Sequence, residues 1–189
     1  MNIEIKNYDT QNTFTKKKGI FFFITGFSGS GKSSIAKIIK KDIRNNYGPT
    51  ILLHGDEIRS LFNLKGYSST DRKKIAMQYS KLCKKITDNG INVILATVSL
   101  YSIVRKWNKA NIVNYIEIYI KSDLSKIIKQ KKKFFYRKKT KNVVGLTIKP
   151  ELPKKPNIIL KNDFKKNINI LSDSLMKKIL NNYVKNDKI

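Results

Sequence analysis

The sequence predicts an α/β fold in which helices cover both faces of a parallel sheet. Short, continuously apolar runs recur along the chain, which is typical of strands buried on both faces, and segments with helical periodicity separate them. A glycine-rich turn joins the first apolar run directly to the first helix. Strands and helices that alternate in this way build a parallel sheet with helices on both sides.

The expected elements follow from these patterns in chain order. Strands are predicted at 19–25, 50–54, 91–97, 115–120 and 157–160. Helices are predicted at 32–45, 70–88, 103–110 and 171–183, and another begins at Leu124 with Asp123 as its N-cap. The first helix presents Ile35, Ala36, Ile38, Ile39 and Ile43 to the core, and the second presents Ile75, Leu82 and Ile86.

Length and composition indicate one globular domain. The chain has 189 residues, of which residues 19–189 are assigned to the domain and the polar residues 1–18 to an N-terminal extension. Its longest apolar run near the N-terminus, residues 19–25, is far shorter than the roughly 20 residues of a membrane helix. Cys83 is the single cysteine, which excludes an internal disulfide and fits a reducing cytoplasm.

The charge balance is strongly basic. Lys and Arg number 40 against 13 Asp and Glu, a net charge of +27. Such a charge suits an anionic partner, such as nucleic acid or a phosphorylated small molecule. Because the lysines are spread along the whole chain with few interleaved aromatics, we attribute most of the charge to general composition.

The segment "GFSGSGKSS", residues 26–34, fits the phosphate-binding P-loop pattern G-x-x-x-x-G-K-[ST]. It directly follows a predicted strand and opens a predicted helix, which is the context that the motif requires. Lys32 is expected to reach the β- and γ-phosphates of ATP, and the Ser33 hydroxyl to bind Mg²⁺. The sequence therefore predicts a P-loop NTPase-type fold, with ATP held by Gly26, Phe27, Ser28, Gly29, Ser30, Gly31, Lys32, Ser33 and Ser34.

A second candidate segment, "LLHGDEIRSLF", ends the next predicted strand at residues 52–62. Ligands of an open parallel sheet bind at the carboxyl ends of its strands, so Asp56 and Arg59 are expected to face the phosphate site. A carboxylate there can take the proton of an attacking hydroxyl, and an arginine can hold a phosphate. The local sequence equally allows a helix-capping aspartate beside a surface arginine.

From Ile20 to Leu160 the chain resembles the adenylylsulfate (APS) kinase family. The family's GLSGAGKTT loop, DGD-x-x-R segment and GFS-x-x-DR segment read here "GFSGSGKSS", "HGDEIR" and "GYSSTDR". Its I-S-P turn, K-G-L-Y-K-K lid and N-F-T-G segment read "VSL", "KFFYRK" and "NVVG", followed by spaced prolines. The resemblance implies transfer of the γ-phosphate of ATP to the ribose 3′-hydroxyl of APS.

The resemblance also implies roles for individual residues. Asp56 matches the base, Lys133 matches a lid lysine near the transferred phosphate, and Lys32 completes the catalytic set. The implied acceptor-binding residues are Asp56, Arg59, Tyr67, Arg72, Ser99, Lys133 and Val143. The basic run 126–141 matches a lid that closes over the ligands, although a nucleic-acid-binding helix has a similar composition.

Several departures from the family fall in the acceptor pocket. His54 replaces the first aspartate of DGD, and we expect it to be a hydrogen-bonding pocket residue. Val143 replaces the phenylalanine that stacks on the adenine of APS, and Gln130 replaces a lid arginine. A cytidine diphosphoramidate or a sugar therefore remains open as the acceptor, and a nucleic-acid-binding P-loop protein is a further alternative. The resemblance leaves a homodimer open.

Overall fold

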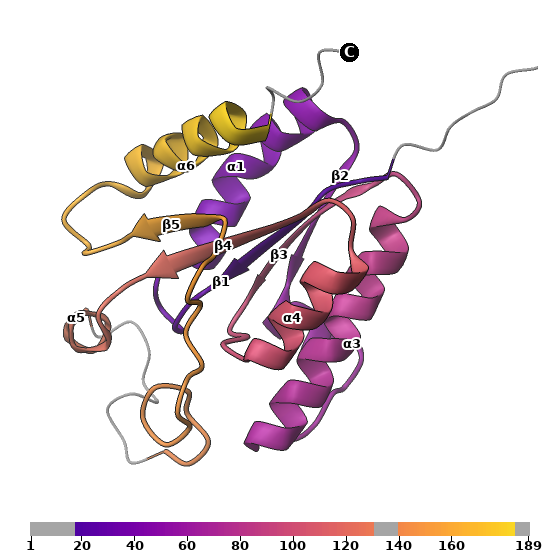
Figure 1. The fold of residues 1–189 in the computed structure, drawn as a ribbon. Coiled ribbons are helices and arrows are strands. Elements are labelled where there is room, and N and C mark those ends of the chain that lie inside the picture. The colour runs from indigo at the N-terminus through magenta and orange to yellow at the C-terminus, as the bar shows by residue number, and fades with distance from the viewer. Residues whose placement is uncertain (1–17, 131–139, 184–189) are drawn as a thin grey trace, which may run out of the picture.

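A parallel five-stranded sheet forms the centre of the computed structural model, which describes residues 18–130 and 140–183 (Figure 1). The strands lie in the order β2-β3-β1-β4-β5, and every neighbouring pair is parallel. Their bounds are Phe21–Thr25 for β1, Thr50–His54 for β2, Asn92–Thr97 for β3, Tyr115–Lys121 for β4 and Ile158–Lys161 for β5. The predicted α/β class is confirmed.

Helices cover both faces of this sheet. The helices α1 (Lys32–Tyr47) and α6 (Ile168–Tyr183) lie on one face, while α3 (Ser69–Thr87) and α4 (Ser102–Asn111) lie on the other (Figure 1). Two short helices, α2 (Gly55–Leu61) and α5 (Leu124–Lys129), directly follow β2 and β4. Both therefore stand at the carboxyl edge of the sheet, where ligands of such folds bind.

The central strand β1 explains why its sequence is apolar without alternation. Phe22 and Ile24 pack into the cluster with α1 and α6, whereas Phe21 and Phe23 pack into the cluster with α3. All four side chains are 0–1% exposed. A strand that is buried on both faces has no solvent side on which to place polar residues.

Two local expectations were wrong. The segment after His54 forms the short helix α2, which was not predicted, because its seven residues are too few to display helical periodicity. In α3, Leu82 is 36% exposed, and Tyr79 and Cys83 occupy the inner positions instead. Ile75, Tyr79 and Cys83 are spaced four residues apart and share one face, and Leu82, seven residues after Ile75, lies at the edge of that face. Burial raises the pKa of the Cys83 thiol, so the reactive thiolate form is disfavoured. Cys83 therefore serves in packing.

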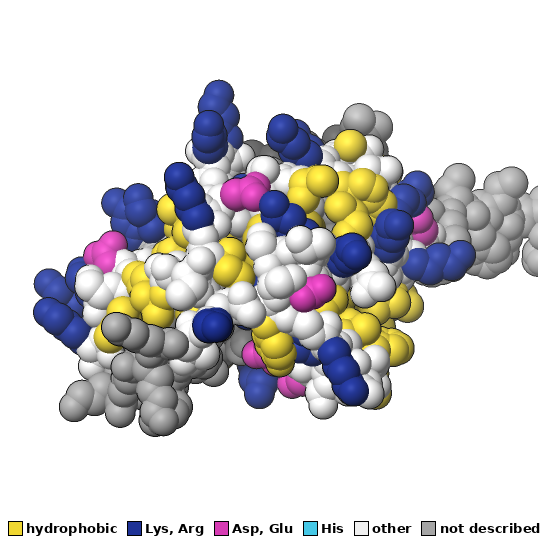
Figure 2. All heavy atoms as spheres, turned by 90° about the horizontal axis from the view of Figure 1, so that it is seen from below, with side chains coloured by type: hydrophobic (Ala, Val, Ile, Leu, Met, Phe, Trp, Pro, Cys, Tyr) yellow, Lys and Arg dark blue, Asp and Glu magenta, His cyan; other side chains and the backbone are white. Residues whose placement is uncertain are grey.

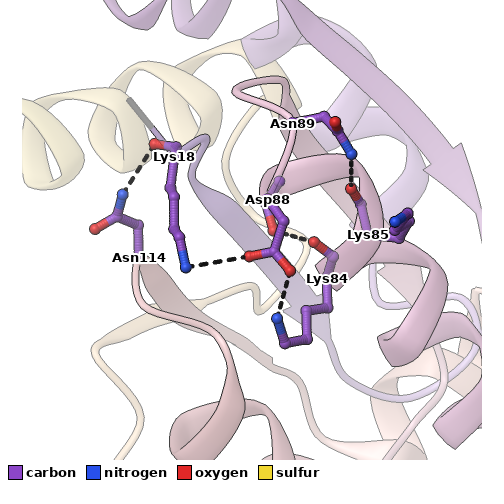
Figure 3. Close-up of polar contacts among 7 residues, drawn as sticks. Lys18, Lys84, Lys85, Asp88, Asn89 and Asn114 are labelled. Atoms are coloured by element: carbon purple, nitrogen blue, oxygen red, sulfur yellow. Dashed lines mark hydrogen bonds and ion pairs between the residues drawn. The ribbon is translucent and has the colours of Figure 1, made fainter. Parts of the chain in front are cut away.

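The start of the domain is fastened to α3 at Lys18 (Figure 3). The Lys18 ammonium lies 3.5 Å from the Asp88 carboxylate, which also pairs with Lys84. The amide of Asn114 donates a hydrogen bond of 3.0 Å to the Lys18 carbonyl. These contacts hold Lys18 against Asp88 and Asn114, while the boundary between an extension 1–18 and a domain 19–189 stays a prediction.

Basic side chains are distributed over the surface. Figure 2 shows Lys and Arg scattered over one face, at its edges and across its middle, and not gathered into one band. This distribution agrees with a generally basic composition. Among the described residues, no helix combines the length and apolar character needed to cross a membrane.

Candidate active site

The P-loop connects the end of β1 to the start of α1. Gly26, Gly29 and Gly31 have φ values of 152°, 82° and 94°, which side chains rarely adopt. A Cβ atom on Gly26 would also lie 2.6 Å from the carbonyl oxygen of Ile120 in β4. The glycines are therefore needed both for the turn and for its close approach to the neighbouring strand. With this turn, the loop leads directly into the N-terminus of α1, which favours anions.

Lys32 and Ser33 occupy the first turn of α1. The Lys32 side chain is buried, and its ammonium donates a hydrogen bond of 2.7 Å to the carbonyl of Phe27 within the loop. The exposed Ser33 and Ser34 lie beside it. A serine hydroxyl and a nearby carboxylate such as Asp56 are hard oxygen ligands, so these residues fit a Mg²⁺ ion that arrives bound to nucleotide phosphates.

Two cavities meet at this edge of the sheet. The first, of about 460 Å³, contains the P-loop residues Gly29, Gly31, Lys32, Ser33 and Ser34, and we call it the donor cavity. The second, of about 530 Å³, lies against α3 and the loop 140–144, and we call it the acceptor cavity. Both volumes suit small-molecule ligands. The two cavities share part of their walls, formed by Ser28, Gly55, Asp56, Thr97 and Val98.

Asp56 is the ionisable side chain in the shared wall. It lies in the first turn of α2, is exposed, and comes directly after β2 and Gly55. The buried Tyr79 of α3 donates a hydrogen bond of 2.8 Å to the carbonyl of Gly55, which fixes the start of α2 against α3. A carboxylate held between two ligand cavities can take a proton from one ligand while the other donates a phosphoryl group.

Arg59, Tyr67 and Arg72 all line the acceptor cavity, and both arginines contact Tyr67. The two guanidinium carbons lie 4.5 Å and 5.2 Å from the centre of the Tyr67 ring. Arg59 also donates to the carbonyls of Leu64 and Gly66, at 2.9 Å and 2.8 Å. The arginines thus hold the loop between α2 and α3 in addition to presenting positive charge to a ligand.

Arg72 also connects α3 to the segment that carries Val143. Its guanidinium donates a hydrogen bond of 3.0 Å to the carbonyl of Asn142. Val143 lines the acceptor cavity, but its side chain is only 7% exposed and packs in a cluster with Phe27 of the P-loop. A Cβ atom on Gly145 would lie 2.8 Å from the Phe27 ring, so this segment rests closely on the P-loop.

Three other residues considered from the sequence have different positions. The Ser99 side chain is buried and lines neither cavity. Lys133 lies outside the described residues, as does most of the predicted lid. His54 lines the donor cavity and is 7% exposed, but neither ring nitrogen has a hydrogen-bond partner within the part of the chain that the structure describes. The expected hydrogen bond of His54 is therefore absent there.

Sequence reasoning missed some residues of the site. Thr97 ends β3, Val98 follows it, and both lie in the shared wall, so the strand-end rule could have found them. Asn162 follows β5, and its amide donates a hydrogen bond of 3.0 Å to the carbonyl of Ser30 in the P-loop. No local pattern marks Asn162, because its partner is 132 residues away in the chain.

Comparison with known proteins identifies the family to which this arrangement belongs. The family model described as adenylylsulphate kinase matches residues 18–161. The chain belongs to the adenylylsulphate kinase family. It is accordingly an ATP-dependent phosphotransferase with a P-loop kinase fold.

Named relatives of the family fall into two substrate groups. A cytidine diphosphoramidate kinase of Campylobacter jejuni is 29% identical over 87% of this chain and 98% of its own length. An adenylyl-sulfate kinase of Buchnera aphidicola is 34% identical over 82% of this chain and 80% of its own length. The APS kinase of Mycobacterium tuberculosis in complex with AMPPNP and APS has the same fold, with a TM-score of 0.75 at 22% identity over 86% of this chain and 98% of its own.

Proposed function

We propose that this chain transfers the γ-phosphate of ATP to a hydroxyl group of a cytidine diphosphate-type acceptor. The observation that carries the proposal is the wall shared by the donor and acceptor cavities, with Asp56 in it. Ligands in the two cavities would meet at this wall, which is the arrangement that direct phosphoryl transfer requires.

The residues of the two cavities supply the parts of this reaction. The P-loop amides and Lys32 would bind the phosphates, and Ser33 would hold Mg²⁺, which offsets charge on the transferring group. Asp56 would accept the proton of the attacking hydroxyl. Arg59 and Arg72, which frame the acceptor cavity, would attract the acceptor phosphates. Lys133 is proposed to approach the transferred phosphate from the lid.

Val143 favours cytidine over adenine as the acceptor base. As a buried member of the cluster with Phe27, it gives the segment 140–144 no aromatic face on which a purine could stack. Base stacking on an aromatic side chain contributes about 1–3 kcal/mol, so a purine would lose affinity here. The resemblance to a cytidine diphosphoramidate kinase over nearly all of that enzyme's length supports the same choice.

Adenylylsulfate is the second candidate acceptor. It is favoured by the family match over residues 18–161 and by adenylyl-sulfate kinases that are 30% and 34% identical to this chain. The chemistry at Asp56 and the P-loop would be the same for either nucleotide. Location in the cytoplasm and assembly as a homodimer stay predictions.

A coupled assay of ADP release tests the proposed function. The panel contains ATP with cytidine diphosphoramidate, APS, a sugar phosphate or single-stranded nucleic acid. We expect turnover to rise most with the cytidine nucleotide, and Lys32→Ala to abolish it without unfolding the protein. A rise with APS alone would favour the second candidate, and a rise with nucleic acid alone would contradict a small-molecule kinase. Full activity in a folded Lys32→Ala variant would contradict the assigned donor site.

Replacing Val143 by phenylalanine separates the two nucleotide acceptors. Because Val143 is already packed against Phe27, a phenylalanine should overpack this cluster, which typically costs about 1–3 kcal/mol of folding free energy. We expect a lower melting temperature, weaker activity with the cytidine nucleotide and no gain with APS. Leu146→Phe is the matched control, because Leu146 is exposed on the same segment. A stable Val143→Phe enzyme with a roughly fivefold lower KM for APS, about 1 kcal/mol, would instead indicate an adenine pocket.

A further inference from the structure

Phe164 has an unusual backbone conformation at the wall of the donor cavity. Its φ is +67°, in the left-handed region that bulky side chains rarely enter. Among the described residues that line this cavity, it is the one phenylalanine, tyrosine or tryptophan. Strained backbone of this kind persists where the surrounding structure imposes it, and it concentrates at ligand sites.

Hydrogen bonds tie the Phe164 turn to the P-loop. The backbone N–H of Phe164 donates to the side-chain oxygen of Asn162 at 3.0 Å, and the amide of Asn162 donates to the carbonyl of Ser30 at the same distance. The Asn162 backbone N–H also donates to the carbonyl of Lys121 in β4, at 2.9 Å. The backbone turn that carries the Phe164 ring is therefore fixed relative to the P-loop.

The strand order places Phe164 on the opposite side of β1 from most of the wall that the donor cavity shares with the acceptor cavity. Apart from Ser28 of the P-loop, the shared wall is built from residues at the carboxyl ends of β2 and β3, which lie on one side of β1. Phe164 follows β5, which lies on the other side of β1, next to β4. A nucleotide whose terminal phosphate points toward the shared wall must extend its nucleoside away from it. The donor-cavity residues that come after β4 and β5 in the chain are Gln130, Asn162, Phe164, Lys166 and Ile168.

We propose that Phe164 is the stacking surface for the purine base of the phosphoryl donor, and thus a determinant of donor affinity. Its ring is partly buried and packs beside the cluster that contains Phe27, so it forms a firm wall of the cavity. The inference rests on the proposed function only in taking a purine nucleoside triphosphate as the donor. It makes no use of the acceptor.

Calorimetric binding of Mg·ADP and of Mg·pyrophosphate to the full chain tests this role. Phe164→Asn removes the ring while keeping a residue that tolerates positive φ, so the turn should be retained. We expect its affinity for ADP to fall about tenfold, which is about 1.4 kcal/mol, and its affinity for pyrophosphate to stay unchanged. Phe164→Tyr keeps the ring and should bind ADP like the unaltered chain. Phe62→Asn is the matched control, because Phe62 is exposed and lines neither cavity.

The other outcomes contradict the proposal. Equal losses for ADP and pyrophosphate would mean that Phe164 acts through the P-loop and not on the base. Unchanged ADP affinity would mean that the base lies elsewhere. If Phe164→Asn does not fold, Phe164→Leu keeps the apolar packing without the aromatic face, and it should show the same selective loss of ADP affinity. The calorimetric experiment contains no acceptor. A failure of the ADP-release assay with every acceptor would therefore not contradict the role of Phe164, and a failure of the calorimetric test would not contradict the proposed acceptor.

Discussion

At the scale of single residues, the proposed chemistry depends on Asp56, which lies in the wall between the two cavities. Asp56 is held there because Gly55 allows the chain to pass Thr97 closely: a Cβ atom on Gly55 would lie 2.5 Å from the Thr97 hydroxyl. Tyr79 secures the same peptide through its hydrogen bond to the Gly55 carbonyl. The position of the proposed base therefore depends on neighbours that have no chemical part in the reaction.

Replacing Asp56 by asparagine tests its role as the base. Asparagine keeps the shape of the side chain but cannot accept a proton, and loss of a general base typically lowers the rate by about 10²–10⁴-fold. We expect kcat to fall in that range while the KM for ATP stays nearly constant. Glu57→Gln is the matched control, since it removes the neighbouring carboxylate that lines neither cavity. A change confined to ATP affinity would assign Asp56 to the metal ion instead.

At the scale of elements, one carboxylate joins its own segment to α3 and α4. Glu151 accepts hydrogen bonds from the backbone N–H of Ser102, at 2.7 Å, and from its hydroxyl, at the N-terminus of α4. It also lies 3.3 Å from the ammonium of Lys73 in α3. Glu151 thus provides the side-chain cap that Tyr101, the N-cap residue of α4, does not supply.

The same carboxylate predicts a pH dependence of stability. The hydrogen bonds from Ser102, and then the charge of Lys73, lower the pKa of Glu151 from 4.5 to about 2. Because the folded form has the lower pKa, its stabilising contribution is complete above about pH 4.5 and is lost as the pH falls toward 2. We expect urea unfolding of Glu151→Gln to show a lower free energy at pH 6 and a smaller decline between pH 5 and pH 3. Asp173→Asn, at an exposed position in α6, should behave like the unaltered chain; an equal decline in Glu151→Gln would contradict the assignment.

At the scale of the whole molecule, the chain carries a net charge of +27, which should attract a polyphosphate ligand such as ATP. The basic residues are spread over the visible face in Figure 2, so the long-range field is diffuse and readily screened by salt. Only those close to a cavity, such as Lys166 in the donor cavity, should contribute specifically to binding. The contribution of the overall net charge to nucleotide affinity can therefore be separated by experiment from that of residues close to the cavity.

Salt titrations of ADP affinity make this separation. We expect affinity to fall as KCl rises from 0.05 M to 0.5 M, because the Debye length shrinks from roughly 14 Å to roughly 4 Å over that range. Lys166→Gln should weaken binding and flatten the salt dependence. The double variant Lys40→Gln/Lys41→Gln, toward the other end of α1, removes more charge but should change both quantities less. The opposite ranking would show that net charge, and not local placement, governs nucleotide binding.

The sequence by itself determined the P-loop, the α/β class and the family. Each of these depends on residues close together in the chain: a spacing of glycines, lysine and serine, or an apolar run that cannot alternate because both its faces are buried. The sequence predicted helix bounds closely where the helical periodicity extends over many residues, as in α3, but it did not predict the seven-residue helix α2. Local signals suffice for such features because local geometry produces them.

The tertiary structure alone decided which distant segments share a wall. Asp56 meets Thr97 and Val98 because β2 and β3 are neighbours in the sheet, and Asn162 reaches Ser30 although 132 residues separate them. Val143 resembles a cavity residue in sequence, yet packing against Phe27 also makes it part of the core. Phe164 follows the sheet strand on the donor side and is held there at positive φ. Strand order and side-chain packing are long-range properties, and no local run of residues encodes the partner that each of these side chains meets.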